Sequence, residues 1–217
     1  CLPKERHGYD PLLCEKRSKM HFGAKAESRY QVLSSAYQMI QAGNYNCPDS
    51  FKDILRQYQE TDSGLDYEYR RFYSAYDRIE DTTAFEPLRD LVENIYTNEY
   101  LETLLPKWNS AMQEPDAFTQ LPLQRDFYAR IVKNAKERTV VIISDAMRYE
   151  VGKELFHRMQ DDPKCSAKLE VQLSVLPSYT RLGMAALLPH TELTMTDDFK
   201  VLVDGLPCDN LSERKTI

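Results

Sequence analysis

Residues 139–159 read TVVIISDAMRYEVGKELFHRM, and this stretch decides the fold class. It opens with a short β-branched run, Val140 to Ile143, which Ser144 and Asp145 interrupt. A continuous apolar run of this length is typical of a strand covered on both faces, as in a parallel sheet. Apolar residues then recur at helical spacing, so residues 147–160 are predicted to form a helix. A strand followed by a helix is the unit from which α/β domains are built.

The residues after this stretch repeat the same order. Apolar and polar residues alternate from Leu169 to Val175, which predicts a second strand. A short helix is expected over residues 181–188, and a third strand over residues 200–203. We therefore expect residues 138–217 to form the first part of an α/β domain with a mostly parallel sheet.

The residues before this stretch carry helical periodicity instead. Apolar residues spaced by three and four predict an α-helical region over residues 1–137, in which residues 1–26 are a loop-rich lead-in. Gly64 is expected to separate two of its helices and Pro106 to kink or restart another. The expected helices cover residues 30–40, 51–58, 65–79, 85–112 and 121–136.

Tyrosine is concentrated in this helical region. Twelve of the fourteen tyrosines precede residue 130, and most of them belong to the helical stripes. A tyrosine-rich face could stack nucleic-acid bases, but stripes at this spacing are more often part of a hydrophobic core. We interpret them as core.

Composition excludes several classes of protein. The chain of 217 residues holds 28 basic and 34 acidic side chains, a net charge of −6, which argues against a broad electrostatic grip on nucleic acid but not against a small local patch. The longest apolar runs fall short of the roughly 18 residues that span a bilayer. Five widely spaced cysteines favour a reducing compartment, and we expect a cytoplasmic protein. The scattered glycines exclude a phosphate-binding P-loop or Rossmann motif.

Two residues occupy matching places at the ends of predicted strands. Asp145 follows the first strand directly, and Thr180 follows the second and begins a helix. Ligands of open α/β sheets gather at the carboxyl ends of the strands, so both side chains are expected near one another at the same rim. A carboxylate there can hold a divalent cation, and a hydroxyl beside the cation can act as a nucleophile. The alternative is that both residues merely cap the helices that follow.

Residues 140–159 and 175–190 resemble the PglZ family of the alkaline phosphatase superfamily. The resemblance rests on a strand followed by Asp145-Ala146-Met147-Arg148-Tyr149-Glu150, and on a second strand followed by Pro177-Ser178-Tyr179-Thr180-Arg181. The last threonine of this motif is similar to the nucleophile of the superfamily's nucleotide pyrophosphatase branch. The helical segment around Asp66-Tyr67-Glu68-Tyr69-Arg70 also looks like the one that precedes the hydrolase domain in bacterial PglZ proteins of BREX phage-defence systems.

The resemblance implies a metal-dependent phosphohydrolase. Thr180 would be the nucleophile. The site would hold two divalent metal ions, either zinc or manganese, and Asp145 and Thr180 would contact one of them. Arg148 and Arg181 are candidates to bind phosphate; the alternative for each is a surface ion pair. Superfamily sites take most of their ligands from segments well after the nucleophile. The acidic and histidine residues that follow Thr180 in this chain do not resemble that cluster of later Asp and His ligands. They are His190, Asp197, Asp198, Asp204 and Asp209.

We therefore interpret the chain, which begins at Cys1, as a fragment that lacks the C-terminal part of the hydrolase domain. It is expected to be inactive and to bind metal weakly or not at all. The expected substrate is a phosphate ester, a nucleotide or a nucleic acid, and other BREX defence proteins are the expected partners. The alternative function is a non-catalytic scaffold that docks proteins of the same defence complex.

Overall fold

The computed structural model describes residues 11–20, 23–119 and 121–217. The chain divides into two compact units. The helical unit consists of Cys1–Glu114 with Tyr149–Glu154, and the C-terminal unit consists of Pro115–Arg148 with Leu155–Ile217. Helix α7, Tyr149–Gln160, contributes its first half to the helical unit. The domain boundary near residue 137 stays a prediction.

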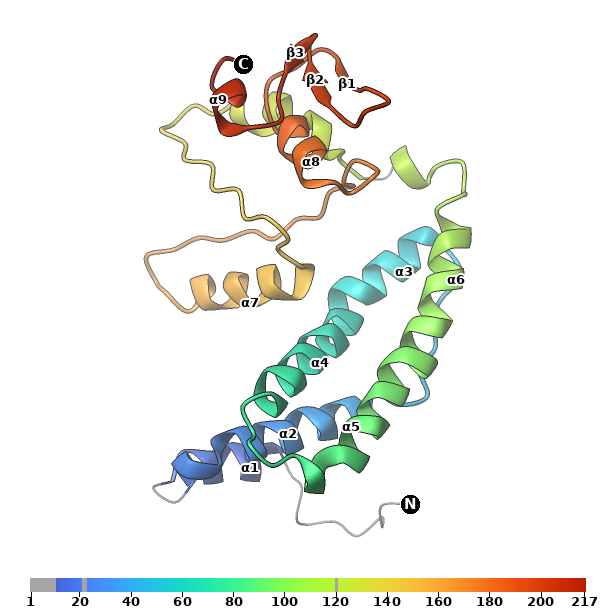
Figure 1. Ribbon diagram of the computed structural model, residues 1–217, viewed down its shortest axis with the longest axis vertical. Coiled ribbons are helices and arrows are strands. Elements are labelled where there is room, and N and C mark those ends of the chain that lie inside the picture. Colours follow the sequence, from blue (N-terminus) through green and yellow to red (C-terminus); the bar gives the residue numbers. More distant parts are fainter. Residues whose placement is uncertain (1–10, 21–22, 120) are drawn as a thin grey trace. The chain divides into compact units, whose positions relative to one another are not determined.

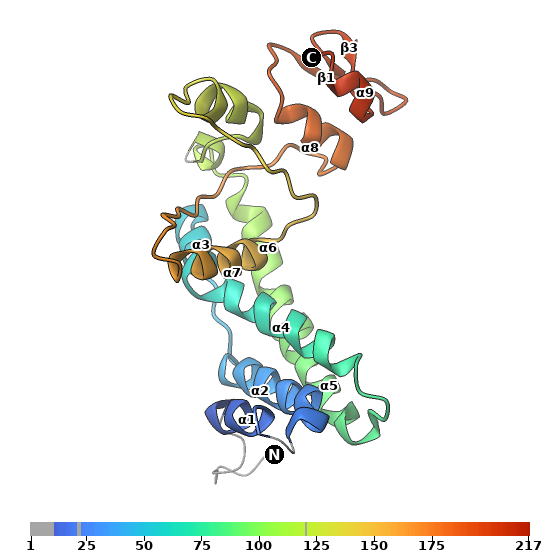
Figure 2. The same ribbon diagram turned by 90° about the vertical axis from the view of Figure 1, so that its left-hand side faces the viewer.

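The helical unit contains the helices that the periodicity predicts. Figure 1 shows α3 continuing into α4, and α5 continuing into α6, while α1 lies beside α2 in Figure 2. Short 3-10 segments, η1 and η3, and π-helical segments, η2 and η4, join these helices. The bounds are α1 Pro11–Ser18, η1 Gly23–Ala26, α2 Glu27–Gln41, α3 Phe51–Gln57, η2 Tyr58–Asp62, α4 Ser63–Tyr76, η3 Thr83–Phe85, α5 Glu86–Glu93, η4 Asn94–Leu101 and α6 Glu102–Ala111.

Two local expectations were wrong in this unit. Residues 11–18 form helix α1 although the loop-rich lead-in was expected to include them, and residues 1–10 lie outside the described residues. Gly64 lies inside α4 and does not separate two helices. Helix α6 does not restart at Pro106, and a kink there stays a prediction. A glycine costs a helix only about 1 kcal/mol relative to alanine. The buried side chains of Leu65 and Phe72 on α4 outweigh that cost.

The core of the helical unit joins side chains from several helices. Val32 and Met39 of α2 pack with Phe72 of α4, Val92 of α5 and Tyr100 of η4, and all five are fully buried. Burial of such side chains stabilises a fold by roughly 1.5–3 kcal/mol each. The helices are therefore held by a shared apolar face rather than by helix propensity alone.

Two buried carboxylates accept hydrogen bonds from three of the tyrosine hydroxyls in this unit. The hydroxyl of Tyr45 donates to Asp62 at 2.7 Å. The hydroxyls of Tyr58 and Tyr96 donate to the two carboxylate oxygens of Asp66, at 2.6 and 2.8 Å. Because buried hydroxyls need partners, these aspartates allow tyrosines to line a protein interior. The interpretation of the tyrosine stripes as core is confirmed for the buried residues Tyr76, Tyr96 and Tyr100 and for Tyr69 and Tyr73, which pack against the core.

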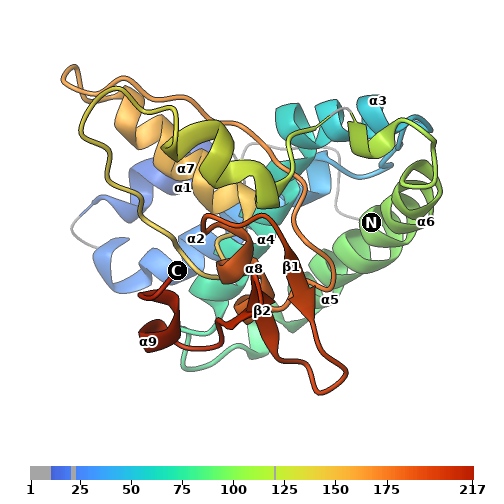
Figure 3. The same cartoon turned by 90° about the horizontal axis from the view of Figure 1, so that it is seen from above.

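The C-terminal unit contains short elements and a small sheet. Its strands pair in the order β1-β2-β3, both pairs antiparallel, with Leu193 opposite Val203 and Val203 opposite Leu206. Helix α8 lies beside this sheet in Figure 3, and its Leu182 and Ala185 pack against Val201 and Val203. The bounds are η5 Ala117–Thr119, η6 Gln124–Asp126, η7 Tyr128–Val132, α8 Thr180–Ala186, β1 Leu193–Met195, β2 Val201–Val203, β3 Leu206–Pro207 and α9 Leu211–Arg214.

The predicted parallel sheet is not what the described residues form. Strand β2 confirms the third predicted strand, but residues 139–143 and 169–175 are not strands in this part of the chain. A single parallel bridge joins Leu173 to Leu123. Residues 140–143 are exposed, with 88% of the surface of Ile142 accessible. A strand requires neighbours for its backbone N–H and C=O groups, and the described residues place none beside this run. The predicted helix over 121–136 is likewise reduced to η6 and η7.

Candidate functional site

Asp145 lies in a sharp turn directly after the apolar run. The next residue, Ala146, has a φ angle of 55°, which costs a non-glycine residue roughly 1–2 kcal/mol. Backbone strain of this kind is concentrated at functional sites. Helix α7 begins only at Tyr149, and its N-cap residue is Arg148, with no side-chain capping hydrogen bond. Asp145 is therefore an exposed carboxylate that does not cap α7.

Thr180 is the first residue of α8 and is exposed. The turn before it is closed by the N–H of Tyr179, which donates to the carbonyl of Pro177 at 2.7 Å. Tyr179 is the N-cap residue of α8, and no side chain makes a capping hydrogen bond there. Neither Thr180 nor Ser178 therefore caps this helix. The hydroxyl of Thr180 stands at a helix start without the structural role that would otherwise explain it.

The two predicted phosphate-binding arginines have different surroundings. Arg148 is exposed at the start of α7. Arg181 lies 3.8 Å from the carboxylate of Asp209, and its guanidinium lies over the ring of Tyr179 at 5.9 Å from the centroid. The surface ion pair considered for Arg181 is thus present.

The later acidic and histidine residues have local structural partners. Nδ1 of His190 lies 2.8 Å from the carbonyl of Leu188. The carboxylate of Asp204 accepts the backbone N–H of Thr191 and of Glu192, at 3.0 and 2.6 Å. Asp209 accepts the N–H of Val201 at 3.2 Å, and Asp198 forms an ion pair with Lys200. These groups stabilise the turns around the small sheet.

The described residues do not fit a metal site by themselves. Among them, no three His, Cys, Asp or Glu side chains gather closely enough to hold an ion. A catalytic zinc generally takes three protein ligands and leaves one position open. Asp145 and Thr180 belong to the same compact unit, and no hydrogen bond joins them in the described part of the chain. Their approach at a shared rim stays a prediction.

A hollow of about 710 Å³ also lies in the C-terminal unit. It is lined by residues of η6, by residues 173–176 and by β1, and it surrounds the parallel bridge between Leu123 and Leu173. Thr180 and Asp145 are not among its lining residues. The hollow therefore does not coincide with the residues that the sequence selects.

Sequence reasoning missed several charged groups of the helical unit. Asp62, Asp66 and Glu150 are buried, and Glu150 lies 3.6 Å from Arg70. The only signal for the two aspartates is their spacing of four residues inside a tyrosine-rich helix. Their partners Tyr45 and Tyr96 come from distant positions, so pairing could not be inferred from local sequence.

None of the helices in the part of the chain that the structure describes has the length and apolar character needed to cross a membrane.

Comparison with known proteins matches both parts of the chain. Residues 125–217 match the family model of the BREX system PglZ alkaline phosphatase-like domain. The chain is 38% identical to the alkaline phosphatase-like protein PglZ of Bacillus cereus (strain H3081.97), over 93% of this chain and 25% of that protein. It is 32% identical to the alkaline phosphatase-like protein BrxZ of Escherichia coli O9:H4 (strain HS), over 98% of this chain and 27% of that protein.

The chain thus spans about a quarter of the length of these curated relatives. No solved structure matches it. The strained turn at Asp145 and the uncapped start of α8 at Thr180 both lie in the region that the family model covers. The matches extend over nearly the whole chain, and on this basis it belongs to the PglZ family of BREX-system alkaline phosphatase-like proteins.

Proposed function

We propose that the full-length protein hydrolyses phosphate esters through Thr180. The observation that carries the proposal is the exposed hydroxyl at the start of α8, which makes no capping hydrogen bond. Its oxygen would attack phosphorus and lose its proton while the bond to the leaving group breaks. Water would then cleave the phosphothreonine ester and restore the hydroxyl. Superfamily likeness alone favours diesters over monoesters.

Asp145 is proposed as one ligand of a two-metal centre, with zinc or manganese as the ions. The Ala146 turn supports this role because it presents an exposed carboxylate at a strained position. The described residues supply too few ligands for either ion, so the remaining ligands are proposed to come from segments outside this chain. We expect the 217-residue chain to bind zinc weakly and to lack turnover.

Arg148 and Arg181 are proposed to contact the substrate phosphate. A guanidinium offers forked N–H donors that match phosphate oxygens. Arg181 would have to exchange its long contact with Asp209 for the substrate. Arg148 is exposed and lies three residues after Asp145. Substrates would be nucleotides or nucleic acid in the cytoplasm, and other BREX proteins the partners.

The test compares Thr180→Ala with Ser178→Ala in the full-length protein, assayed on a chromogenic phosphodiester with added zinc or manganese. Thr180→Ala should abolish turnover, while Ser178→Ala, which removes a hydroxyl from the same turn, should retain it. Thr180→Ser should keep measurable activity because it keeps the hydroxyl. Normal turnover by the Thr180→Ala protein would refute the proposed nucleophile.

The alternative function is a non-catalytic scaffold that docks proteins of the same defence complex. It predicts a full-length protein without bound metal and without turnover that still co-purifies with other BREX proteins. Metal analysis of the full-length protein separates the two functions. An enzyme requires roughly stoichiometric metal that Asp145→Ala reduces.

A further inference from the structure

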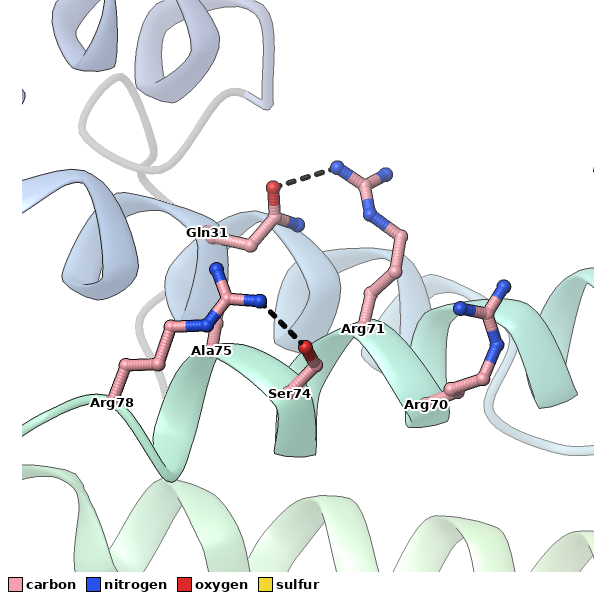
Figure 4. Close-up of a pocket in the computed structure, with 6 residues that line it drawn as sticks. All are labelled: Gln31, Arg70, Arg71, Ser74, Ala75 and Arg78. Carbon is pink, nitrogen blue, oxygen red and sulfur yellow. Dashed lines mark hydrogen bonds between the residues drawn. The ribbon is translucent and has the colours of Figure 1, made fainter. Parts of the chain in front are cut away.

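A small pocket in the helical unit is lined mainly by arginines. It lies between α2 and α4, has a volume of about 160 Å³, and is drawn in Figure 4. The lining residues are Gln31, Arg70, Arg71, Ser74, Ala75 and Arg78.

The spacing of these residues places them on one side of α4. Arg71, Ser74 and Arg78 are separated by three and four residues, the interval at which helical side chains are neighbours. Arg78 lies just after the last residue of α4. In a chain with a net charge of −6, such a local group of cations is the kind of small basic patch that overall charge does not exclude.

Hydrogen bonds hold the arginines in place. Arg71 donates to the side-chain oxygen of Gln31 at 2.6 Å, and the Gln31 amide donates in turn to Ser35 at 2.9 Å. Arg78 donates to the hydroxyl of Ser74 at 3.0 Å. Figure 4 shows the contact between Arg71 and Gln31 and the contact between Arg78 and Ser74. Each guanidinium carries five N–H donors, so most remain available, and the Ser74 hydroxyl can still donate its own proton.

An aromatic ring supports two of the guanidinium groups from one side. Arg70 and Arg71 lie 5.4 and 5.1 Å from the centroid of the Tyr67 ring. These contacts fall within the range of cation–π attraction. A guanidinium that is already ordered loses less entropy when it binds an anion.

Carboxylates neutralise these cations only in part. Arg70 forms ion pairs with Glu154 and Glu150 of α7, at 3.2 and 3.6 Å, and Arg71 lies 3.6 Å from Glu68. None of these three carboxylates lines the pocket. No carboxylate pairs with Arg78 among the described residues, and its side chain is exposed. Excess positive charge therefore remains on the side of Arg71 and Arg78.

We propose that this pocket binds a phosphate group. Arg71, Arg78 and Ser74 offer N–H and O–H donors on one side of α4, and forked guanidinium donors match the oxygens of a phosphate group. The volume of about 160 Å³ admits one such group. The site lies in the helical unit and does not depend on Thr180 or Asp145.

The phosphate group has two possible sources, free inorganic phosphate and the monoester of a nucleotide. Calorimetric titration of the 217-residue chain with inorganic phosphate and with adenosine 5′-monophosphate separates them. Ionic strength is kept constant, because salt alone screens exposed charges. Saturable binding with Kd at or below about 1 mM is expected for at least one of the two. Equal affinity assigns the site to the phosphate group itself, and tighter nucleotide binding assigns it to the monoester.

The variants are Arg71→Gln, Arg78→Gln and a matched control, Arg89→Gln. Arg89 is a partly exposed arginine of α5 that pairs with Asp90, so its loss changes the net charge equally outside the pocket. The two pocket variants should weaken binding about tenfold or more, because each removes a charge-assisted hydrogen bond, and the control should change it less than about twofold. Arg78→Lys should recover only part of the affinity.

Arg78→Gln keeps the test decisive if Arg71→Gln unfolds the chain, because Arg78 is exposed beyond the helix end. Circular dichroism confirms folding for each variant. Absence of saturable binding by the unmodified chain would overturn the proposal. So would an unchanged affinity in Arg78→Gln, or an equal loss in Arg89→Gln.

Discussion

At the scale of single residues, polar side chains at helix starts differ in whether they cap the helix. Ser50 caps α3 by accepting the N–H of Asp53, and Asn210 forms a capping box with Glu213 at α9. Thr180 begins α8 without any such bond. Tyr179 is the N-cap residue of α8, so the Thr180 hydroxyl, one residue later, is not held by the helix backbone.

This contrast predicts different costs of removing the side chains. Ser50→Ala and Asn210→Ala should each lower the free energy of unfolding by about 1 kcal/mol, because a backbone N–H loses its partner. Thr180→Ala should change it by less than about 0.5 kcal/mol. Urea unfolding of the three variants measures these costs. A Thr180→Ala loss as large as that of Asn210→Ala would mean that Thr180 has a structural role after all.

The buried carboxylate of Asp66 gives a second prediction at this scale. Tyr58 and Tyr96 each donate to one of its oxygens, so Asp66→Asn would turn an amide N–H₂ toward a hydroxyl donor. We expect a loss of about 1–3 kcal/mol in the free energy of unfolding.

The matched control is Asp90→Asn, which alters an exposed aspartate that pairs with Arg89. Its effect should stay within about 0.5 kcal/mol. Similar stabilities of the two variants, measured by urea unfolding, would contradict a structural role for the Asp66 carboxylate.

At the scale of elements, local pattern predicted the helices well and the strands poorly. Periodicity identified α2, α3 and α4 because a helix satisfies its own backbone hydrogen bonds. Residues 139–143 have the composition of a buried strand, yet they are exposed and unpaired in the described part of the chain. Strand formation depends on a distant partner, and local sequence cannot show whether one is present.

The sequence could likewise predict only part of the candidate site. Asp145 and Thr180 could be selected because each follows an apolar run, and their exposure and lack of a capping role could be known only from structure. The arginine pocket could not be predicted, because Gln31 joins it from a helix about forty residues earlier in the chain.

The π-helical segment η2 gives a prediction for elements. Lys153 of α7 donates to the carbonyls of Gln59 and Glu60 in η2, at 2.6 and 3.3 Å, and to the hydroxyl of Ser63. Lys153→Met should lower the free energy of unfolding by about 1–2 kcal/mol and increase hydrogen exchange in η2 and in residues 149–154.

Lys168→Met is the control, because Lys168 is exposed and pairs only with nearby Glu170 among the described residues. It should leave exchange in η2 unchanged. If Lys153→Met also leaves that exchange unchanged, the lysine does not anchor α7 to η2.

At the scale of the whole molecule, the ionisable groups of the described residues have different hydrogen-bond partners in the two units. Five tyrosine hydroxyls of the helical unit donate to buried or half-buried carboxylates, whereas acidic groups of the C-terminal unit accept backbone N–H groups at turns. The helical unit should therefore be the part of the chain that is sensitive to alkaline pH.

Burial raises the pKa of Tyr69 to about 12, and its hydrogen bond to Glu93 and the charge of that carboxylate act in the same direction. Tyr73 also donates to Glu93, and burial followed by this bond raises its pKa as well. An unfolded tyrosine ionises near pH 10. The stabilising contribution of both residues is therefore fully present below about pH 10 and is lost at higher pH, for Tyr69 as the pH rises through about 12.

Unfolding of the chain should accordingly become easier between about pH 10 and 12, with tyrosinate absorbance rising later than in the unfolded chain. Glu93→Gln removes the charge that Tyr69 and Tyr73 contact, so their titration should move toward the ordinary value while burial keeps part of the shift. Glu170→Gln, which alters an exposed glutamate beside Lys168, should leave the titration unchanged. If every tyrosine of the folded chain ionises near pH 10 without loss of helical circular dichroism, the tyrosine–carboxylate contacts do not stabilise the helical unit.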